Sequence, residues 1–289
     1  MFHNTLDQID TAGPLPFTRP FFDIAAEGIG SERLDSNDQI VETFFKKWEQ
    51  FIGEYDADTR CSVLADMLGR FPAALAVNNI DIEGLFKKVL NDGKGTQDPA
   101  IAFKLGGHIA SNPYAPIIPR FFEKFLTAGT YAELVKGFTS ELSKAGYSVL
   151  KPKDIKVFLT TTNHLFYKFY KADYFKFVLE IMRSDTPDHL ISYFLFPMRN
   201  EYLSLIKGMF GELRAQMEGL RMIAEFFERA FEDEGISKEK KKYLYSCFKQ
   251  IETDLSEGMF SQPASISQEV KDIRDKFHYL EERFRVVSL

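Results

Sequence analysis

The chain has 289 residues, of which 45% are hydrophobic and 29 are phenylalanine, so it carries enough apolar side chains to bury a sizeable core. Its formal net charge of -6 and its pI near 5.5 argue against a nucleic-acid partner and an anionic membrane surface, because both require an excess of Lys and Arg. No window approaches the roughly 20 apolar residues of a membrane span, so we expect no span.

Cysteine usage points to a reducing compartment. Cys61 and Cys247 are the two cysteines, and both fall within apolar helical patterns. This placement predicts buried free thiols rather than a disulfide framework. The first ten residues lack the basic and apolar segments of a secretory signal. We therefore expect a cytosolic protein.

The first half of the chain predicts an arm followed by short helices. Residues 1–35 contain Gly and Pro without a sustained period, which indicates an irregular N-terminal arm. Residues 36–148 predict a short-helix bundle with helices at about 57–70 and 119–128. Its helix-start signals are Ser36 with Gln39, Asp81, Asp98 with Pro99, and Thr130 with Glu133.

Residues 149–289 predict a layer of longer helices, beginning with a central pair. The stretch at 154–183 is aromatic almost all round, which is typical of helices covered on most sides. Lys168, Lys171 and Lys176 alternate with these aromatic residues. We interpret them as solvated amines beside an apolar face.

The remaining helices complete an all-α fold. Pro197 is predicted to break the chain, and a long helix is then expected at 198–231, weakened by its glycines. Further helices follow at 238–257, capped by Ser237, and at 268–286. The predicted fold class is an irregular multi-helix bundle of about ten or eleven helices.

Metal and cofactor binding are not indicated. The five histidines are His3, His108, His164, His189 and His278, and no two of them share a helical face at metal-ligand spacing. No glycine loop has the form that cradles phosphates, so we expect no metal and no cofactor. His108 follows Gly106 and Gly107, where a backbone can approach a ligand closely, but we interpret these residues as part of helix packing. We interpret His164 as a structural polar group among buried aromatics.

Charged residues near two predicted helix starts are further candidates. Lys238 to Lys242 includes four lysines in a first helical turn, where they oppose the helix dipole. This hints at an acidic neighbour, although a solvated turn accounts for them as well. Asp188 follows Pro187 in another first turn, where a carboxylate can project from the surface. The alternative for Asp188 is stabilisation of the helix dipole, about 0.3–1 kcal/mol.

Three stretches resemble a known family. LKPKDIKVFLTTTNHLF at 150–166, SDTPDHLISYF at 184–194 and PMRNEYLSLIKGMF at 197–210 look like the central helices of the vacuolar-sorting (Rabex-type) domain. Proteins with that domain are all-helical and catalyse nucleotide exchange on endosomal Rab GTPases. The resemblance therefore implies a small GTPase of the Rab family as partner.

The resemblance also implies site residues. Family members insert an acidic side chain from a helix start into the GTPase nucleotide site, where it competes with the phosphates for the lysine and Mg²⁺. Asp188 occupies the corresponding place, with Asp185 as the fallback, and His189 and Tyr202 are the implied partner-binding residues. The sequence departs from the pattern at 217–223, because the family's helper tyrosine falls there and this chain has none.

The C-terminal sequence LEERFRVVSL carries a second resemblance, to the translocation signals of type IV secretion effectors from intracellular bacteria. An ordinary amphipathic helix end explains the same residues. Together the two resemblances imply a protein delivered into a host cell to act on vesicle traffic.

Three functional hypotheses follow from the sequence. The first is an exchange factor for endosomal Rab-family GTPases that acts through Asp188. The second is a non-catalytic helical interaction module whose exposed aromatic groove takes a partner helix or peptide. The third is a hydrolase that uses His164 or His189, for which no nucleophile and base can be paired by spacing.

Overall fold

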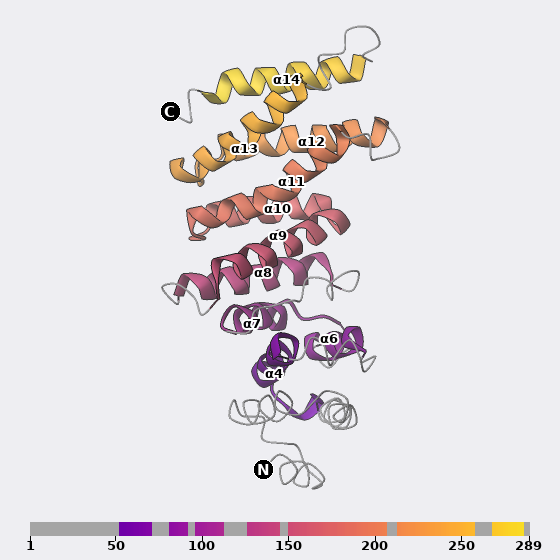
Figure 1. The fold of residues 1–289 in the computed structure, drawn as a ribbon, viewed down its shortest axis with the longest axis vertical. Helices are drawn as coiled ribbons and strands as arrows, with labels where there is room; N and C mark the ends of the chain where they lie inside the picture. Colours follow the sequence, from indigo (N-terminus) through magenta and orange to yellow (C-terminus); the bar gives the residue numbers. More distant parts are fainter. Residues whose placement is uncertain are drawn as a thin grey trace. The chain divides into compact units, whose positions relative to one another are not determined.

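The chain is helical throughout its described parts. A computed structural model describes residues 52–70, 81–91, 96–112, 126–144, 150–206, 213–257 and 268–285 (Figure 1). Within these ranges it contains ten α-helices, two short 3-10 turns and no strand beyond an isolated bridge between Asn91 and Gln97. The predicted all-α fold class is confirmed. None of the described helices is long and apolar enough to traverse a bilayer.

Some sequence predictions fall on other residues. The arm at 1–35, the cap at Ser36 and most of the helix expected at 119–128 lie outside the described ranges. The division by helix length into an arm, a short-helix bundle at 36–148 and a long-helix layer at 149–289 stays a prediction.

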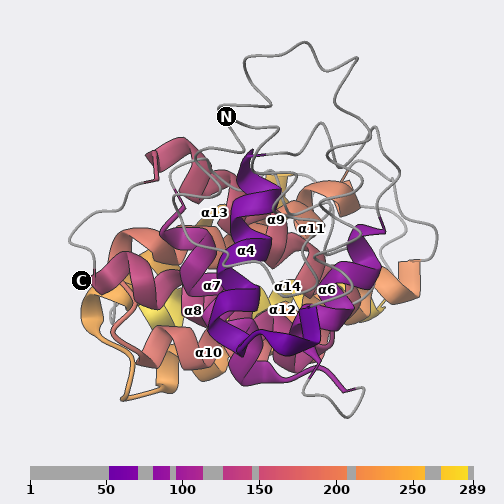
Figure 2. The same cartoon turned by 90° about the horizontal axis from the view of Figure 1, so that it is seen from below.

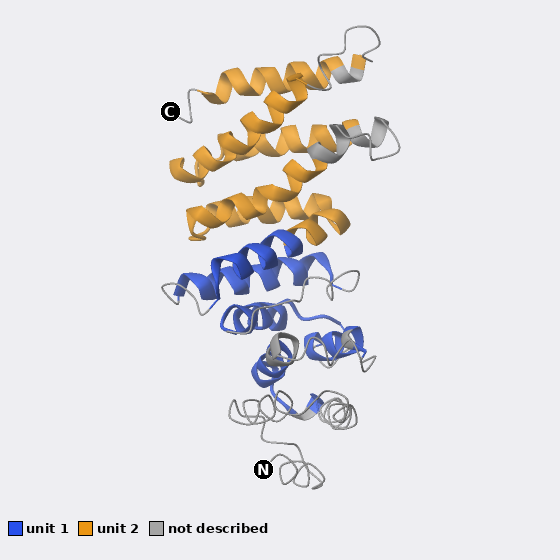
Figure 3. Ribbon diagram, viewed as in Figure 1, with its two compact units in different colours: residues 1–162 blue, residues 163–289 orange. Residues whose placement is uncertain are grey.

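The chain divides into two compact units, residues 1–162 and 163–289 (Figure 3). In unit 1, α4 packs on α6 and α7, and α7 packs extensively on α8 (Figures 1 and 2). Its described elements are η2 (Ile52–Glu54), α4 (Ala57–Arg70), α6 (Ile82–Leu90), α7 (Pro99–Ala110), α8 (Ala128–Lys144) and the first part of α9 (Pro152–Phe169).

Unit 2 begins within α9 and continues as a series of longer helices. In it α11 packs on α13, and α12, α13 and α14 pack on one another. Its further elements are α10 (Lys171–Arg183), η4 (Asp188–Leu190), α11 (Ile191–Ile206), α12 (Leu213–Glu232), α13 (Lys238–Glu257) and α14 (Gln268–Arg285).

Local capping explains where several helices begin. Asp81 and Asp98 each accept a backbone hydrogen bond at 2.8 Å, from the N–H groups of Gly84 and Ala100, and so begin α6 and α7 as predicted. The Ser237 hydroxyl accepts from the N–H of Lys240 at 3.3 Å and begins α13, also as predicted.

The cap predicted at Thr130 is wrong by one turn. Helix α8 begins at Ala128, and Thr130 lies inside its first turn. Thr127 and Thr130 satisfy each other: the Thr127 N–H donates to the Thr130 hydroxyl at 2.9 Å, and the Thr130 N–H donates to the Thr127 hydroxyl at 3.3 Å. Two threonines thus form the reciprocal pair that Thr and Glu form in a capping box. Glu133 instead pairs with Lys136 at 2.9 Å.

Helices α7 and α8 cross with their backbones in contact. A Cβ added to Gly106 would lie 2.0 Å from the Leu134 carbonyl oxygen, and one added to Gly137 would lie 1.9 Å from that of Phe103. Only glycine leaves room for this approach. The helix-packing interpretation of the residues around His108 agrees with this crossing.

The core of unit 2 is built from aromatic rings. Phe166 contacts Tyr174 and Phe177 at 5.3 Å between ring centroids, and Phe177 contacts Phe194 at 6.0 Å. The fully buried Tyr174 hydroxyl donates to the Phe194 carbonyl at 2.6 Å. The aromatic excess in the sequence is therefore used, in this part of the chain, to join α9, α10 and α11.

The break predicted at Pro197 is wrong. Helix α11 begins at Ile191 rather than near Met198, and it continues through Pro197 to Ile206. A proline in a helix leaves the carbonyl four residues earlier without its usual N–H donor. That carbonyl belongs to Tyr193, and it accepts from the Asn163 Nδ2 of α9 at 3.3 Å. A side chain from a neighbouring helix thus replaces the missing backbone donor.

Candidate functional site

The predicted catalytic carboxylates lie in the connection between α10 and α11. Asp185 is exposed in the turn that follows α10, and half-buried Asp188 is the first residue of η4, which leads directly into α11. His189 is the exposed second residue of η4. Tyr202 belongs to α11, and its side chain lies outside the described part. The connection therefore brings Asp185, Asp188 and His189 together in one short segment.

A buried lysine from another helix faces this connection. Lys240 lies in the first turn of α13, is only 5% exposed, and donates from Nζ to the Ser184 carbonyl. Burial lowers the pKa of Lys240, whereas the charges of Asp188 and Asp185 raise it. The two carboxylates consequently have a counter-ion within their own chain.

Sequence reasoning missed the role of Lys240. The sequence favours a solvated first turn. Lys238 and Lys242 are indeed exposed, but Lys240 is buried, so the expectation is wrong for Lys240. One signal in the sequence does indicate this role. A lysine in a first helical turn opposes the helix dipole, so an acidic neighbour is expected near it.

An ion pair ties the end of α10 to the turn after α12. Two guanidinium nitrogens of Arg183 contact Asp233 Oδ2, Nε at 2.7 Å and a terminal nitrogen at 2.5 Å. The hydrogen bond from Arg183 lowers the pKa of Asp233 and raises that of Arg183. The same carboxylate accepts from the Gly235 N–H at 2.9 Å, which shapes the turn. These contacts hold two turns of unit 2 together, so their role is structural.

A carboxyl group in the interior of unit 2 has the most perturbed environment of the described acids. Glu201 of α11 contacts Lys171 Nζ at 2.5 Å, and its side chain is 16% exposed. Burial raises the pKa of Glu201 to about 7. Burial also lowers the pKa of Lys171, whereas the charge of Glu218 raises it. The burial of Glu201 agrees with its Oε2 atom, which is buried without a hydrogen-bond donor among the described residues.

Two neighbours complete the cluster around Glu201. A Cβ on Gly219 of α12 would lie 2.7 Å from Glu201 Oε1, so this glycine makes room for the carboxyl group. Lys171 Nζ also lies 5.1 Å from the centre of the Tyr167 ring, a cation–π distance. The expectation of a solvated amine is thus wrong for Lys171, while the side chains of Lys168 and Lys176 are exposed. A glycine inside a helical pattern was the available signal for this site.

The cysteines, His108 and His164 are further residues whose side chains can take part in catalysis. Burial raises the pKa of both Cys61 and Cys247 to about 12, so neither thiol is a nucleophile near neutral pH. His108 lies 3.1 Å from Asp58 across α4 and α7. Near His164, the Thr160 hydroxyl donates to the Lys156 carbonyl at 2.7 Å. Among the described residues no group of His, Cys, Asp and Glu could hold a metal ion.

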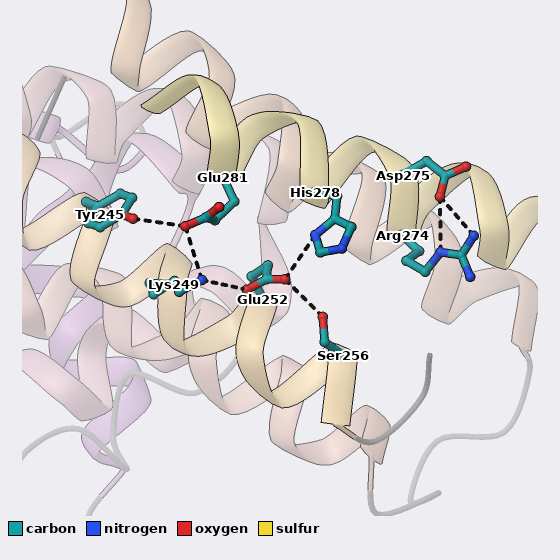
Figure 4. Close-up of polar contacts among 8 residues, drawn as sticks. All are labelled: Tyr245, Lys249, Glu252, Ser256, Arg274, Asp275, His278 and Glu281. Atoms are coloured by element: carbon teal, nitrogen blue, oxygen red, sulfur yellow. Dashed lines mark hydrogen bonds and ion pairs between the residues drawn. The ribbon is translucent and has the colours of Figure 1, made fainter. Parts of the chain in front are cut away.

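Helices α13 and α14 share a polar network (Figure 4). Lys249 donates to Glu252 at 3.2 Å and to Glu281 at 3.1 Å, bridging the two helices. Glu281 also accepts from the Tyr245 hydroxyl at 3.2 Å, and its bonds from Lys249 and Tyr245 lower its pKa against the effect of burial. His278 Nδ1 lies 3.4 Å from Glu252. The network fastens α14 to α13 in one register.

Comparisons with protein-family models, curated proteins and solved structures find no match to this chain.

Proposed function

We propose that this protein is a non-catalytic, all-helical module that binds other proteins. The observation that carries the proposal is the use of its ionisable groups. Lys240, Lys171 and Lys249 each contact a neighbouring helix or turn rather than converging with a nucleophile and a base. Such contacts hold the helices of unit 2 in fixed positions, and a rigid helical surface is suited to binding other proteins.

The surface on which a partner binds differs from the expected aromatic groove. Among the described residues the exposed large apolar side chains are Val157, Tyr243 and Tyr279, which belong to three different helices. The aromatic rings of unit 2 are mainly buried between helices. A partner that uses aromatic contacts must therefore reach a surface that one of the protein's own helices now covers.

Reconstitution of a complex tests the proposal. A protein captured on the purified chain is expressed separately and titrated against it by isothermal calorimetry. We expect saturable binding of one defined stoichiometry, and none to a heat-unfolded sample used as the control. If no captured protein binds in purified form, the proposal is refuted.

A second candidate function is nucleotide exchange on a Rab-family GTPase, with delivery into a host cell by a type IV secretion system. The observation that favours it is the position of Asp188, half-buried at the start of η4 and α11, with Asp185 in the turn before it. For this chemistry the carboxylate must overcome the attraction of the nearby Lys240 charge and reach the positive charges that hold the nucleotide phosphates.

Two substitutions of opposite effect test the exchange candidate. Release of fluorescent GDP is measured across a panel of endosomal Rab proteins. Asp188→Ala should abolish the acceleration, and Lys240→Met should increase it because the internal competitor is removed. Circular dichroism shows whether each variant is folded. An unchanged release rate with the wild-type chain across the whole panel eliminates this candidate.

A further inference from the structure

Helix α14 lies against α12 and α13 through one apolar stripe. Ile273, Phe277, Leu280 and Phe284 are each at most 3% exposed. Their spacing of i, i+4, i+7 and i+11 is the anchor pattern by which an amphipathic helix occupies a groove on another protein.

The groove under this stripe is lined by aromatic rings. Phe284 stacks on Phe231 of α12 with centroids 4.3 Å apart, and Phe277 stacks on Phe248 of α13 at 5.5 Å. Phe227 of α12 contacts Phe248 at 5.2 Å and joins the two walls. Aromatic pairs in these geometries stabilise the contact beyond the burial of their area.

One edge of the groove is acidic. Glu228 of α12 contacts Lys276 at 2.7 Å, and Glu232, one helical turn later, contacts Arg283 at 2.8 Å. Both bases belong to α14 and lie on the same side of its apolar stripe. The acidic edge therefore selects a helix with bases three and ten residues after its first anchor.

The other edge is basic. Lys249 of α13 contacts Glu281, which follows the third anchor directly, and Tyr245 donates to the same carboxylate (Figure 4). By contrast, Arg274 pairs with its own neighbour Asp275 at 3.0 Å, on α14 itself. The charges that cross the interface thus fix the direction and register of α14, a role that apolar contacts perform poorly because they are not directional.

We propose that the groove between α12 and α13 is a helix-binding site, that α14 is its resident ligand, and that a partner protein binds by placing a helix of the same register there. The partner helix carries four apolar anchors at the spacing of α14, bases opposite Glu228 and Glu232, and an acid opposite Lys249. This inference rests on the proposed function as a protein-binding module and names its surface.

A labelled peptide of residues 268–285 tests the groove in the full-length chain. Phe277→Ala and Phe284→Ala together weaken the resident helix and leave the walls on α12 and α13 unchanged. Fluorescence anisotropy should show saturable binding to this double variant. Binding to the wild-type chain should be at least tenfold weaker, because a tethered helix competes at an effective concentration of about 1 mM.

The charge pattern supplies the matched control. A peptide with Lys276→Glu and Arg283→Glu should bind at least tenfold more weakly, and Glu228→Lys with Glu232→Lys in the double variant should restore its binding. A peptide with Lys276→Glu alone is compared with a control peptide that carries Lys271→Glu, an equal change in net charge at an exposed residue off both edges. The control peptide should bind like the unmodified peptide.

Hydrogen exchange on the wild-type chain keeps the inference testable if the double variant does not fold. Amides of α14 should exchange at least tenfold faster than the slowest amides of α12 and α13, since a resident ligand must leave separately. Equal exchange in all three helices, or a folded double variant that does not bind the peptide, overturns the inference. Peptide binding without any reconstituted partner complex would instead retain the groove and refute the proposed function.

Discussion

The close crossing of α7 and α8 predicts that one methyl group destabilises unit 1. In Gly106→Ala the new Cβ would lie 2.0 Å from the Leu134 carbonyl oxygen, whereas ordinary contact begins near 3.4 Å. The helices would have to separate locally by about 1.4 Å, the difference of these two distances. Overpacking of this kind costs roughly 1–3 kcal/mol or more, and here the obstacle is backbone that cannot rotate away.

Helix propensity acts in the opposite direction. Replacing glycine by alanine within a helix gains about 1 kcal/mol. Gly107 provides the matched control, because a Cβ there would lie 3.9 Å from the Gly137 carbonyl oxygen, which is ordinary contact. Gly107→Ala should therefore be neutral or stabilising. For Gly106→Ala we expect a net loss of about 2 kcal/mol, since the steric cost exceeds the propensity gain.

Thermal unfolding followed by circular dichroism measures the difference. A loss of about 2 kcal/mol corresponds to a decrease in Tm of roughly 4–8 °C for a unit of this size. Because a chain with two units need not unfold in one step, hydrogen exchange of the α7 and α8 amides assigns the change to this crossing. If Gly106→Ala and Gly107→Ala have equal stability, the inferred backbone contact is refuted.

Three further predictions concern unit 2. Burial raises the pKa of Glu201 from 4.5 to about 7 in the folded state, so the folded state holds a proton that the unfolded state has lost. The free energy of unfolding should therefore fall by up to about 3 kcal/mol as pH rises from 4.5 to 7. Urea titrations should show this slope in the wild type but not in Glu201→Gln; parallel curves would contradict it. Asn163→Ala should lower the free energy of unfolding by about 1–3 kcal/mol, because it leaves the Tyr193 carbonyl unpaired. The loss should be smaller in a Pro197→Ala background, where the backbone N–H donor returns. Additive losses in urea unfolding would contradict the inference that Asn163 replaces this backbone donor. Lys240→Met should destabilise the chain by about 1 kcal/mol or more through loss of its bond to Ser184, measured in the same way, and an unchanged stability would show that the bond contributes nothing net.

Helix starts were largely predictable because capping is local. Asp81, Asp98 and Ser237 each bond to a backbone N–H within three residues, so the sequence contains both partners at a fixed spacing. Thr130 shows the limit of this reasoning. Its hydroxyl can serve as a cap or as the reciprocal partner of a cap, and the presence of Thr127 three residues earlier decided between them.

The polar sites could not be predicted in the same way, because their partners are distant in sequence. Lys240 of α13 bonds to the carbonyl of Ser184 in the turn after α10, and Lys171 of α10 bonds to Glu201 of α11. A lysine beside aromatic residues has the same sequence pattern whether its amine is solvated or paired. Only the packing of α11 and α12 around the carboxyl group distinguishes Lys171 from Lys168.

Helix α11 continues through Pro197, although the usual effect of an interior proline predicts that the helix ends there. An interior proline removes one backbone bond, and the Tyr193 carbonyl accordingly has a side-chain donor instead of a backbone one. The cost that normally ends a helix there is offset by Asn163, a buried residue on α9. Asn163 and Pro197 therefore act together, because the asparagine supplies the hydrogen bond that the proline removes. Considered separately, each residue predicts a different structure.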